Sequence, residues 1–112
     1  MAVSIVKLFS PTQLGTAVAT IYTAPTNPAS TVKNGRVRLT NTSASAATAT
    51  LYTVPSGGAA SAGNECLAAV SIPAGQNLDI DFPSLGPGDT LQGLSGTASA
   101  ITISEMGGVV YS

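Results

Sequence analysis

Asp79 and Asp81 lie two positions apart in the segment "LDIDF", so their side chains would project from the same face of a strand. Carboxylate oxygens are preferred ligands of Ca²⁺, and these two residues together with Asp89 are the candidate metal ligands of this sequence. No segment has the spaced acidic ligands of a calcium-binding loop. We therefore expect a solvated strand face here and no bound metal.

Other chemistry is limited by the residue types that the chain contains. It has no histidine, which removes the commonest general base and excludes Ser-His-Asp and Cys-His arrangements. The segment "GPGDTLQG" at residues 86–93 contains a GxG pattern but lacks the context of a phosphate-binding loop. We interpret it as a turn from Gly86 to Asp89 inside a hairpin, and we predict no catalytic residues, no cofactor and no enzymatic activity.

Cys66 is the only cysteine, so an intrachain disulfide is excluded. Its flanking segment, "ECLAAVSI", alternates in the manner of a strand. We interpret Cys66 as a small buried hydrophobic residue rather than a reactive thiol.

Arg36 and Arg38 form the nearest approach to a basic patch, in the segment "KNGRVR". At this spacing both side chains share one strand face, which we interpret as a solvated or interface-facing strand edge. The chain has only four Lys and Arg residues. Because neutralising many phosphates requires more cations than this, nucleic-acid binding is not expected.

The elements that would carry these residues are strands, because apolar residues alternate with polar ones along much of the chain. Val37 and Leu39 alternate with the arginines, and Ile101 and Ile103 alternate with Thr102 and Ser104. The same pattern gives two further sets of side chains on one face: Cys66, Ala68, Val70 and Ile72, and Leu78, Ile80 and Phe82.

Turn-forming segments separate these runs: "TNPAS", "TNTSAS", "PSGGAASAG", "PAGQN", "PSLGPGD", "SGTAS" and "MGG". About seven or eight short strands at this spacing predict an all-β antiparallel sandwich or barrel. A chain of 112 residues fits one domain, which we assign to residues 1–112. We expect the longest loop at residues 56–64.

A short repeat links two of the predicted strands, since "ATIYTAP" at residues 19–25 returns as "ATLYTVP" at residues 49–55. We interpret the two copies as equivalent strands in the two halves of the sandwich. Strand periodicity then places Ile21 and Leu51 in the core, with Tyr22 and Tyr52 together on a second face. The tyrosines either cover the rim of the core or anchor an interface, because tyrosine is enriched at interfaces.

Charge is scarce, at 8% of residues against about a quarter in a typical domain. The chain is 44% hydrophobic with a formal net charge of −1, so we expect it to fold, and its near-zero charge favours association. The N-terminal segment lacks the pattern of a signal peptide, and no segment is apolar enough to span a membrane. We expect a protein that is made in a cytoplasm and covered by copies of itself or by a partner.

The run "VRLTNTSASAATATLYTVPSGG", together with "IPAGQ", "GPGDTLQG" and the closing alternating segment, resembles small virion proteins of tailed bacteriophages. The resemblance extends from about Leu8 to Met106. It implies a jelly-roll-like β-sandwich that serves as a head decoration (cement) protein or as a tail-associated subunit. It brings no catalytic residues with it.

Our first hypothesis is therefore a phage capsid decoration protein that stabilises the particle as a homo-oligomer, a trimer or a dimer, in contact with a capsid or tail protein. The candidate interface residues are Tyr22, Tyr52, Arg36 and Arg38. The alternative is a carbohydrate- or cell-surface-binding sandwich, which would require Tyr22, Tyr52 and Tyr111 to line one groove. A small hydrolase using Asp79, Asp81 or Glu105 is the weakest alternative.

Overall fold

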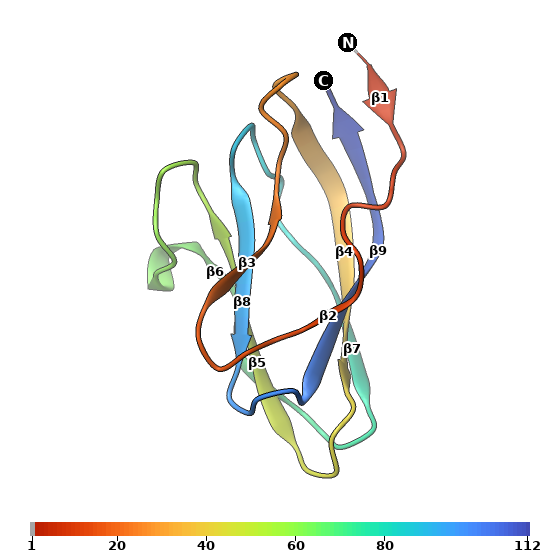
Figure 1. Ribbon diagram of the computed structural model, residues 1–112, viewed down its shortest axis with the longest axis vertical. Helices are drawn as coiled ribbons and strands as arrows, with labels where there is room; N and C mark the ends of the chain where they lie inside the picture. Colours follow the sequence, from red (N-terminus) through yellow and green to blue (C-terminus); the bar gives the residue numbers. More distant parts are fainter. Residues whose placement is uncertain (1) are drawn as a thin grey trace.

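Two antiparallel β-sheets lie side by side in the computed structural model, which describes residues 2–112 (Figure 1). The longer strands form because β-branched and apolar side chains alternate with small polar ones, and most of them stop at a segment rich in Gly, Pro, Ser or Asn. The nine strands are β1 (Val3–Ser4), β2 (Thr12–Gln13), β3 (Ala19–Thr23), β4 (Thr31–Asn41), β5 (Ala47–Val54), β6 (Glu65–Ile72), β7 (Asn77–Asp81), β8 (Thr90–Ser95) and β9 (Ile101–Tyr111). A short 3-10 turn, η1 (Ala62–Asn64), ends the longest loop, which is the predicted one.

The strand order identifies the sandwich as a jelly roll. One sheet has the order β1-β9-β4-β7 with β2 also paired to β9, and the other has the order β3-β8-β5-β6. Taken as one interrupted strand, β1 and β2 pair with the last strand, β3 pairs with β8, β4 with β7 and β5 with β6. This nested pairing of eight strands is the jelly-roll winding. The predicted all-β, jelly-roll-like sandwich is confirmed, with one strand more than expected because the first is interrupted.

The core lies between the two sheets and consists of the residues that the alternation predicted. Val37 and Leu39 of β4 and Ile101 and Ile103 of β9 are fully buried. The facing sheet contributes residues of β5 and β8 to the same cluster. The largest fully buried apolar side chains are Leu39, Leu51, Ile72, Leu85, Leu91, Ile101, Ile103, Val32, Val37 and Val54.

Asn41 is a fully buried polar residue that joins two turns at one end of the sandwich. Its side-chain amide donates to the carbonyl oxygens of Ser45 and Ile72, both at 2.8 Å. Its side-chain oxygen accepts from the backbone N–H and the hydroxyl of Ser43, at 2.9 and 2.7 Å. This polar side chain of the "RLTNTS" segment can be buried because its amide and its oxygen all have hydrogen-bond partners there.

One predicted turn and one predicted hairpin are wrong. The segment "MGG" at residues 106–108 lies inside β9, where the pairing with β4 shifts register between Lys33 and Arg36 and again between Arg36 and Val37. The turn from Gly86 to Asp89 does form, with the N–H of Asp89 donating to the carbonyl of Gly86. However, β7 and β8 on its two sides belong to different sheets, so the turn does not close a hairpin.

The alternation in β6 is also less regular than predicted. Ile72 is buried, but Ala68 and Ala69 are exposed. Ala69 has a positive φ of 44°, and the pairing of β6 with β5 shifts register in two places. This bulge interrupts the period of two that the sequence pattern assumed.

Candidate functional site: the outer faces of the two sheets

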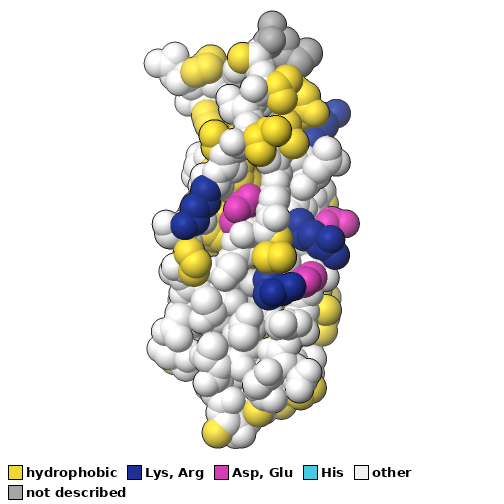
Figure 2. Space-filling model, turned by 90° about the vertical axis from the view of Figure 1, so that its right-hand side faces the viewer, with side chains coloured by type: hydrophobic (Ala, Val, Ile, Leu, Met, Phe, Trp, Pro, Cys, Tyr) yellow, Lys and Arg dark blue, Asp and Glu magenta, His cyan; other side chains and the backbone are white. Residues whose placement is uncertain are grey.

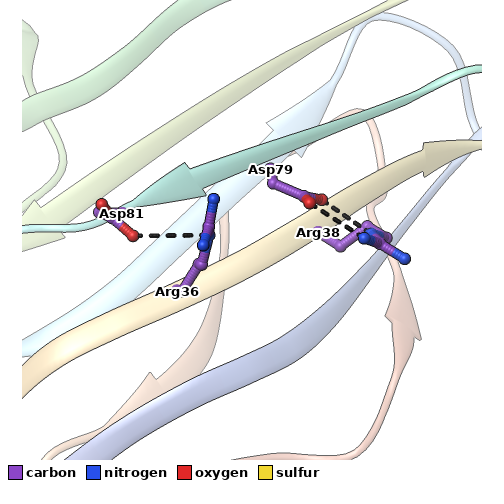
Figure 3. A network of polar contacts seen from close by, with 4 residues as sticks. All are labelled: Arg36, Arg38, Asp79 and Asp81. Carbon is purple, nitrogen blue, oxygen red and sulfur yellow. Dashed lines mark hydrogen bonds and ion pairs between the residues drawn. The ribbon is translucent and has the colours of Figure 1, made fainter.

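Four charged residues form two cross-strand pairs on the outer face of the β1-β9-β4-β7 sheet (Figure 3). Arg38 of β4 donates from Nε and Nη2 to the two carboxylate oxygens of Asp79 of β7, at 2.7 and 3.0 Å. Nε of Arg36 lies 3.7 Å from Oδ1 of Asp81. The register explains both pairs, since these residues lie directly opposite each other on neighbouring antiparallel strands.

The two pairs differ in strength. The bidentate hydrogen bonds from Arg38 hold the pKa of Asp79 below its ordinary value, despite an opposing effect of burial, and Asp79 in turn raises the pKa of Arg38. The side chains of Arg36 and Asp81 are 56% and 81% exposed. A solvated pair of this kind contributes little to stability.

The arginines do not lie on a strand edge, which corrects that expectation. β4 lies between β9 and β7 in the sheet, and the edge strand is β7, which carries the two aspartates. Figure 2 shows the charged side chains of both signs together across the middle of this flank of the molecule. The local charge is therefore largely cancelled on this face.

Asp89, which the sequence offered as a candidate metal ligand, is bonded to backbone N–H groups. One of its carboxylate oxygens accepts from the N–H of Gly86 at 2.8 Å, and the other accepts from the N–H of Ser56 at 2.9 Å. It thereby links the turn before β8 to the loop after β5. Within residues 2–112, no three His, Cys, Asp or Glu side chains are grouped so that they could hold a metal ion.

The two repeated strands lie in one sheet, which corrects the prediction that they occupy different halves of the sandwich. β3 and β5 flank β8 on its two sides, each antiparallel to it. The pairing of β3 with β8 shifts register between Thr20 and Tyr22, whereas β5 pairs with β8 without interruption. After this shift, the side chains of the first copy point to the opposite side of the sheet from the corresponding side chains of the second copy.

Tyr22 and Tyr52 consequently do not share a face. Tyr22 lies opposite the fully buried Leu91 and packs against the core, with its ring centroid 6.3 Å from that of Phe9. Tyr52 lies opposite Gln92 and adjoins the fully buried Leu51 in sequence, so it points outward. Desolvation raises the pKa of both tyrosines, and the carboxylate of Glu65 adds to the rise at Tyr52.

The aromatic groove required by the carbohydrate-binding alternative is not formed. Tyr111 lies on β9, in the other sheet from Tyr22 and Tyr52. The three tyrosines thus occupy one inner face, one outer face and the end of the opposite sheet. No single ligand could stack on all three.

The outer face of the β3-β8-β5-β6 sheet is a feature that the sequence analysis missed. Among its four strands, the only charged residue is Glu65, at the first position of the edge strand β6. We call this surface the uncharged face and define it by residues that the register places outward. They are Thr20, Thr48, Thr50, Tyr52, Gln92 and Leu94. Thr50 is itself buried, and Glu65 borders this face because it lies opposite Tyr52 on the neighbouring strand.

A signal for the uncharged face was present in the sequence. The charged residues cluster at residues 33–38 and 79–89, while residues 39–64 and 90–104 contain none. These two uncharged stretches include β5 and β8, the two central strands of the sheet. Strand pairing was needed to show that they are neighbours.

Cys66 packs against the core, as expected of a hydrophobic residue, but it is half-buried and not fully buried. Burial raises the pKa of its thiol, and the carboxylate of Glu65 contributes in the same direction, while a backbone hydrogen bond partly offsets both effects. A thiol with a raised pKa has a smaller thiolate fraction at neutral pH and is a weaker nucleophile.

Exposed apolar side chains gather at the end of the molecule where the two termini lie (Figures 1 and 2). Val3, Ile5 and Val6 are 57%, 85% and 50% exposed. Among residues 2–112, no helix is both long and apolar enough to cross a membrane.

Comparison with known proteins shows similarity at the level of the fold. No protein-family model and no curated protein sequence matches the chain. A chain in a structure of the Gx strain of infectious bursal disease virus superposes with a TM-score of 0.54 and 13% sequence identity. The match covers 97% of this chain and 31% of the viral chain, so the protein corresponds to about a third of that chain's length. The protein therefore shares its β-sandwich fold with part of a chain from a virus.

Proposed function

We propose that the protein is a structural subunit of a virus particle, specifically a head decoration (cement) protein of a tailed bacteriophage. It would stabilise the particle through protein–protein contacts as a homo-oligomer bound to a capsid protein. Jelly rolls recur in viral capsid domains, and the fold likeness to a viral chain agrees with this role. The assignment to tailed phages rests on the resemblance of the turn segments from "RLTNTS" to "GPGDTLQG".

The observation that carries the proposal is the nearly neutral surface of the sandwich. The chain has nine charged residues, and the charges of four of them cancel in the ion pairs Arg38–Asp79 and Arg36–Asp81. The carboxylate of Asp89 accepts hydrogen bonds from two backbone N–H groups. Interfaces are depleted in charge at their centres, and a neutral protein associates readily. Such a surface suits a subunit that is covered by its neighbours in an assembled virion.

The proposed role is non-catalytic and involves neither nucleic acid nor a membrane. Asp79 is held ionised by Arg38, with a lowered pKa, and this is the opposite of what a general acid requires. The carboxyl of Asp81 is largely solvated. Neither aspartate therefore has the environment of a hydrolytic acid, and we assign both to the fold.

The test is the removal of the gene from the virus that encodes the chain. We expect the mutant particles to release their DNA at a lower temperature than wild-type particles, and added purified protein to restore the wild-type temperature. Gold-labelled antibodies against the chain should decorate the heads in electron micrographs. Labelling of the tail would support the tail-associated alternative, and unlabelled particles of unchanged heat resistance would refute a structural role.

A further inference from the structure

We propose that the Asn34–Gly35 bond in β4 is a site of spontaneous covalent modification, at which the asparagine converts to aspartate and isoaspartate. The two residues lie in the segment "KNGRVR", and the proposed function assigns no role to them. The reaction needs only this chain and water. The inference therefore goes beyond the proposed function and does not depend on it.

The reaction is an attack of the backbone on its own side chain. The backbone nitrogen of Gly35 forms a bond to the side-chain amide carbon of Asn34, and the C–N bond of that amide breaks. Ammonia leaves with the proton that the backbone nitrogen gives up, and a succinimide ring closes. Water then opens the ring at the side-chain carbonyl, which yields aspartate, or at the backbone carbonyl, which yields isoaspartate.

Gly35 removes the steric obstacle to this attack. A following residue with a side chain shields its own backbone nitrogen and restricts the rotation that brings this nitrogen to the amide carbon, whereas glycine does neither. Asn34 is the only one of the five asparagines that precedes glycine. Asn27 precedes Pro28, which has no backbone N–H and cannot react in this way.

A β-bulge takes both residues out of the strand ladder. The pairing of β4 with β9 passes from Lys33 directly to Arg36, so Asn34 and Gly35 have no partner in that register. Asn34 has a positive φ of 57°, a conformation that asparagine adopts more readily than most residues and that occurs in bulges. Rotation of the peptide group between the two residues therefore breaks no pair of this ladder.

The side-chain amide of Asn34 is exposed, and among residues 2–112 no hydrogen bond holds it. Two other asparagines are restrained. The amide of Asn41 donates to two carbonyl oxygens, and the amide of Asn64 donates to the carbonyl of Ala59 at 2.9 Å. An amide held in this way cannot turn toward the next backbone nitrogen.

Asn77 offers a comparison within the same molecule. It is exposed like Asn34, but it is paired with Thr40 in the β4–β7 ladder and precedes Leu78. Both differences oppose the reaction, since the ladder restrains the backbone and the leucine side chain shields the nitrogen. We therefore expect Asn34 to react and Asn77 to remain intact.

The two products differ in their effect on the fold. Both add a negative charge beside Lys33 and Arg36, in a chain whose formal net charge is −1. Isoaspartate also inserts a methylene group into the main chain next to Gly35, which is buried under the ring of Phe82. The carbonyl of Gly35 accepts from the N–H of Phe82 at 3.0 Å. A longer main chain would disturb this contact, so isoaspartate should lower the stability more than aspartate does.

Mass spectrometry of the folded protein tests the inference. The protein is incubated in mildly alkaline buffer, where loss of the backbone proton is favoured, and samples are digested with pepsin in acid, which stops the reaction. The replacement of NH2 by OH is then assigned by fragmentation, and an isoaspartyl methyltransferase labels isoaspartate alone. Asn77 is the internal control. Asn34→Gln is the matched variant, because its amide lies one methylene farther from the backbone nitrogen, and Asn34→Asp is the standard for the aspartate product.

We expect Asn34 to lose its amide at least about tenfold faster than Asn77, at a rate that increases with pH. An acidic form that coelutes with Asn34→Asp in ion-exchange chromatography should accumulate in the wild type and be absent from Asn34→Gln. The isoaspartate form should unfold at a lower urea concentration than Asn34→Asp. If Asn34 keeps its amide as long as Asn77 does, while the urea-unfolded chain loses it, the fold protects the bond and the inference is overturned. The same acidic form in Asn34→Gln would place the reaction elsewhere and overturn it as well.

Discussion

Replacing Asn41 by alanine should destabilise the sandwich far more than a typical change in a turn. The side chain is fully buried and makes four hydrogen bonds, two donated to the carbonyls of Ser45 and Ile72 and two accepted from Ser43. At about 1 kcal/mol for each bond, and because the Ser43 hydroxyl can donate instead to the carbonyl of Ser45 at 2.8 Å, the free energy of unfolding should fall by about 3 kcal/mol. The bond to Ile72 matters most, because it is buried.

Urea denaturation followed by circular dichroism measures this loss. For a slope of about 1.5 kcal/mol per molar urea, the midpoint should fall by about 2 M. Thr42→Ala is the control, because the neighbouring Thr42 is exposed and its hydroxyl makes one long bond of 3.3 Å to Ala100. If Asn41→Ala costs no more than this control, then Asn41 does not hold the two turns together and our account of the "RLTNTS" segment is refuted.

Three further changes test the packing and the charges. Gly35→Ala should cost about 1–3 kcal/mol, because its new methyl group would overlap the ring of Phe82; Gly15→Ala, where a Cβ meets no atom within 4 Å, should be nearly neutral in the same urea titration. Asp79→Asn should lower the urea midpoint at neutral pH, because the depressed pKa of Asp79 adds stability above its ordinary value of 3.8; the difference from wild type should shrink as the pH falls below that value, and a constant difference would contradict the ion-pair account. Cys66 should react with a disulfide reagent at pH 8 more slowly than free cysteine, and an equal rate in the folded and the urea-unfolded protein would show that burial does not control the thiol.

The strand alternation predicted the core well because burial on one side of a sheet imposes a period of two. Val37, Leu39, Ile101 and Ile103 were all identified in this way. The pattern failed where an extra residue breaks the period. Between Thr20 and Tyr22 a bulge changes which side chains point inward, and the sequence "ATIYT" is too similar to "ATLYT" to reveal it.

The candidate surfaces were less predictable, because they depend on contacts between distant strands. The pairing of Arg38 with Asp79 joins residues 41 positions apart and follows from the β4–β7 register, which no local pattern specifies. The uncharged face likewise appears only when β5 and β8 become neighbours. In both cases the residue types were evident in the sequence, and their juxtaposition required the fold.

The most direct measurement is the quantity of this chain in purified virus particles. Particles banded on a density gradient would be digested, and peptides of the chain would be counted by mass spectrometry against those of the major shell protein. A structural subunit predicts many copies in a fixed ratio to the shell protein in every preparation. A chain that is missing from washed particles, or that varies without relation to the shell protein, would contradict the proposed function.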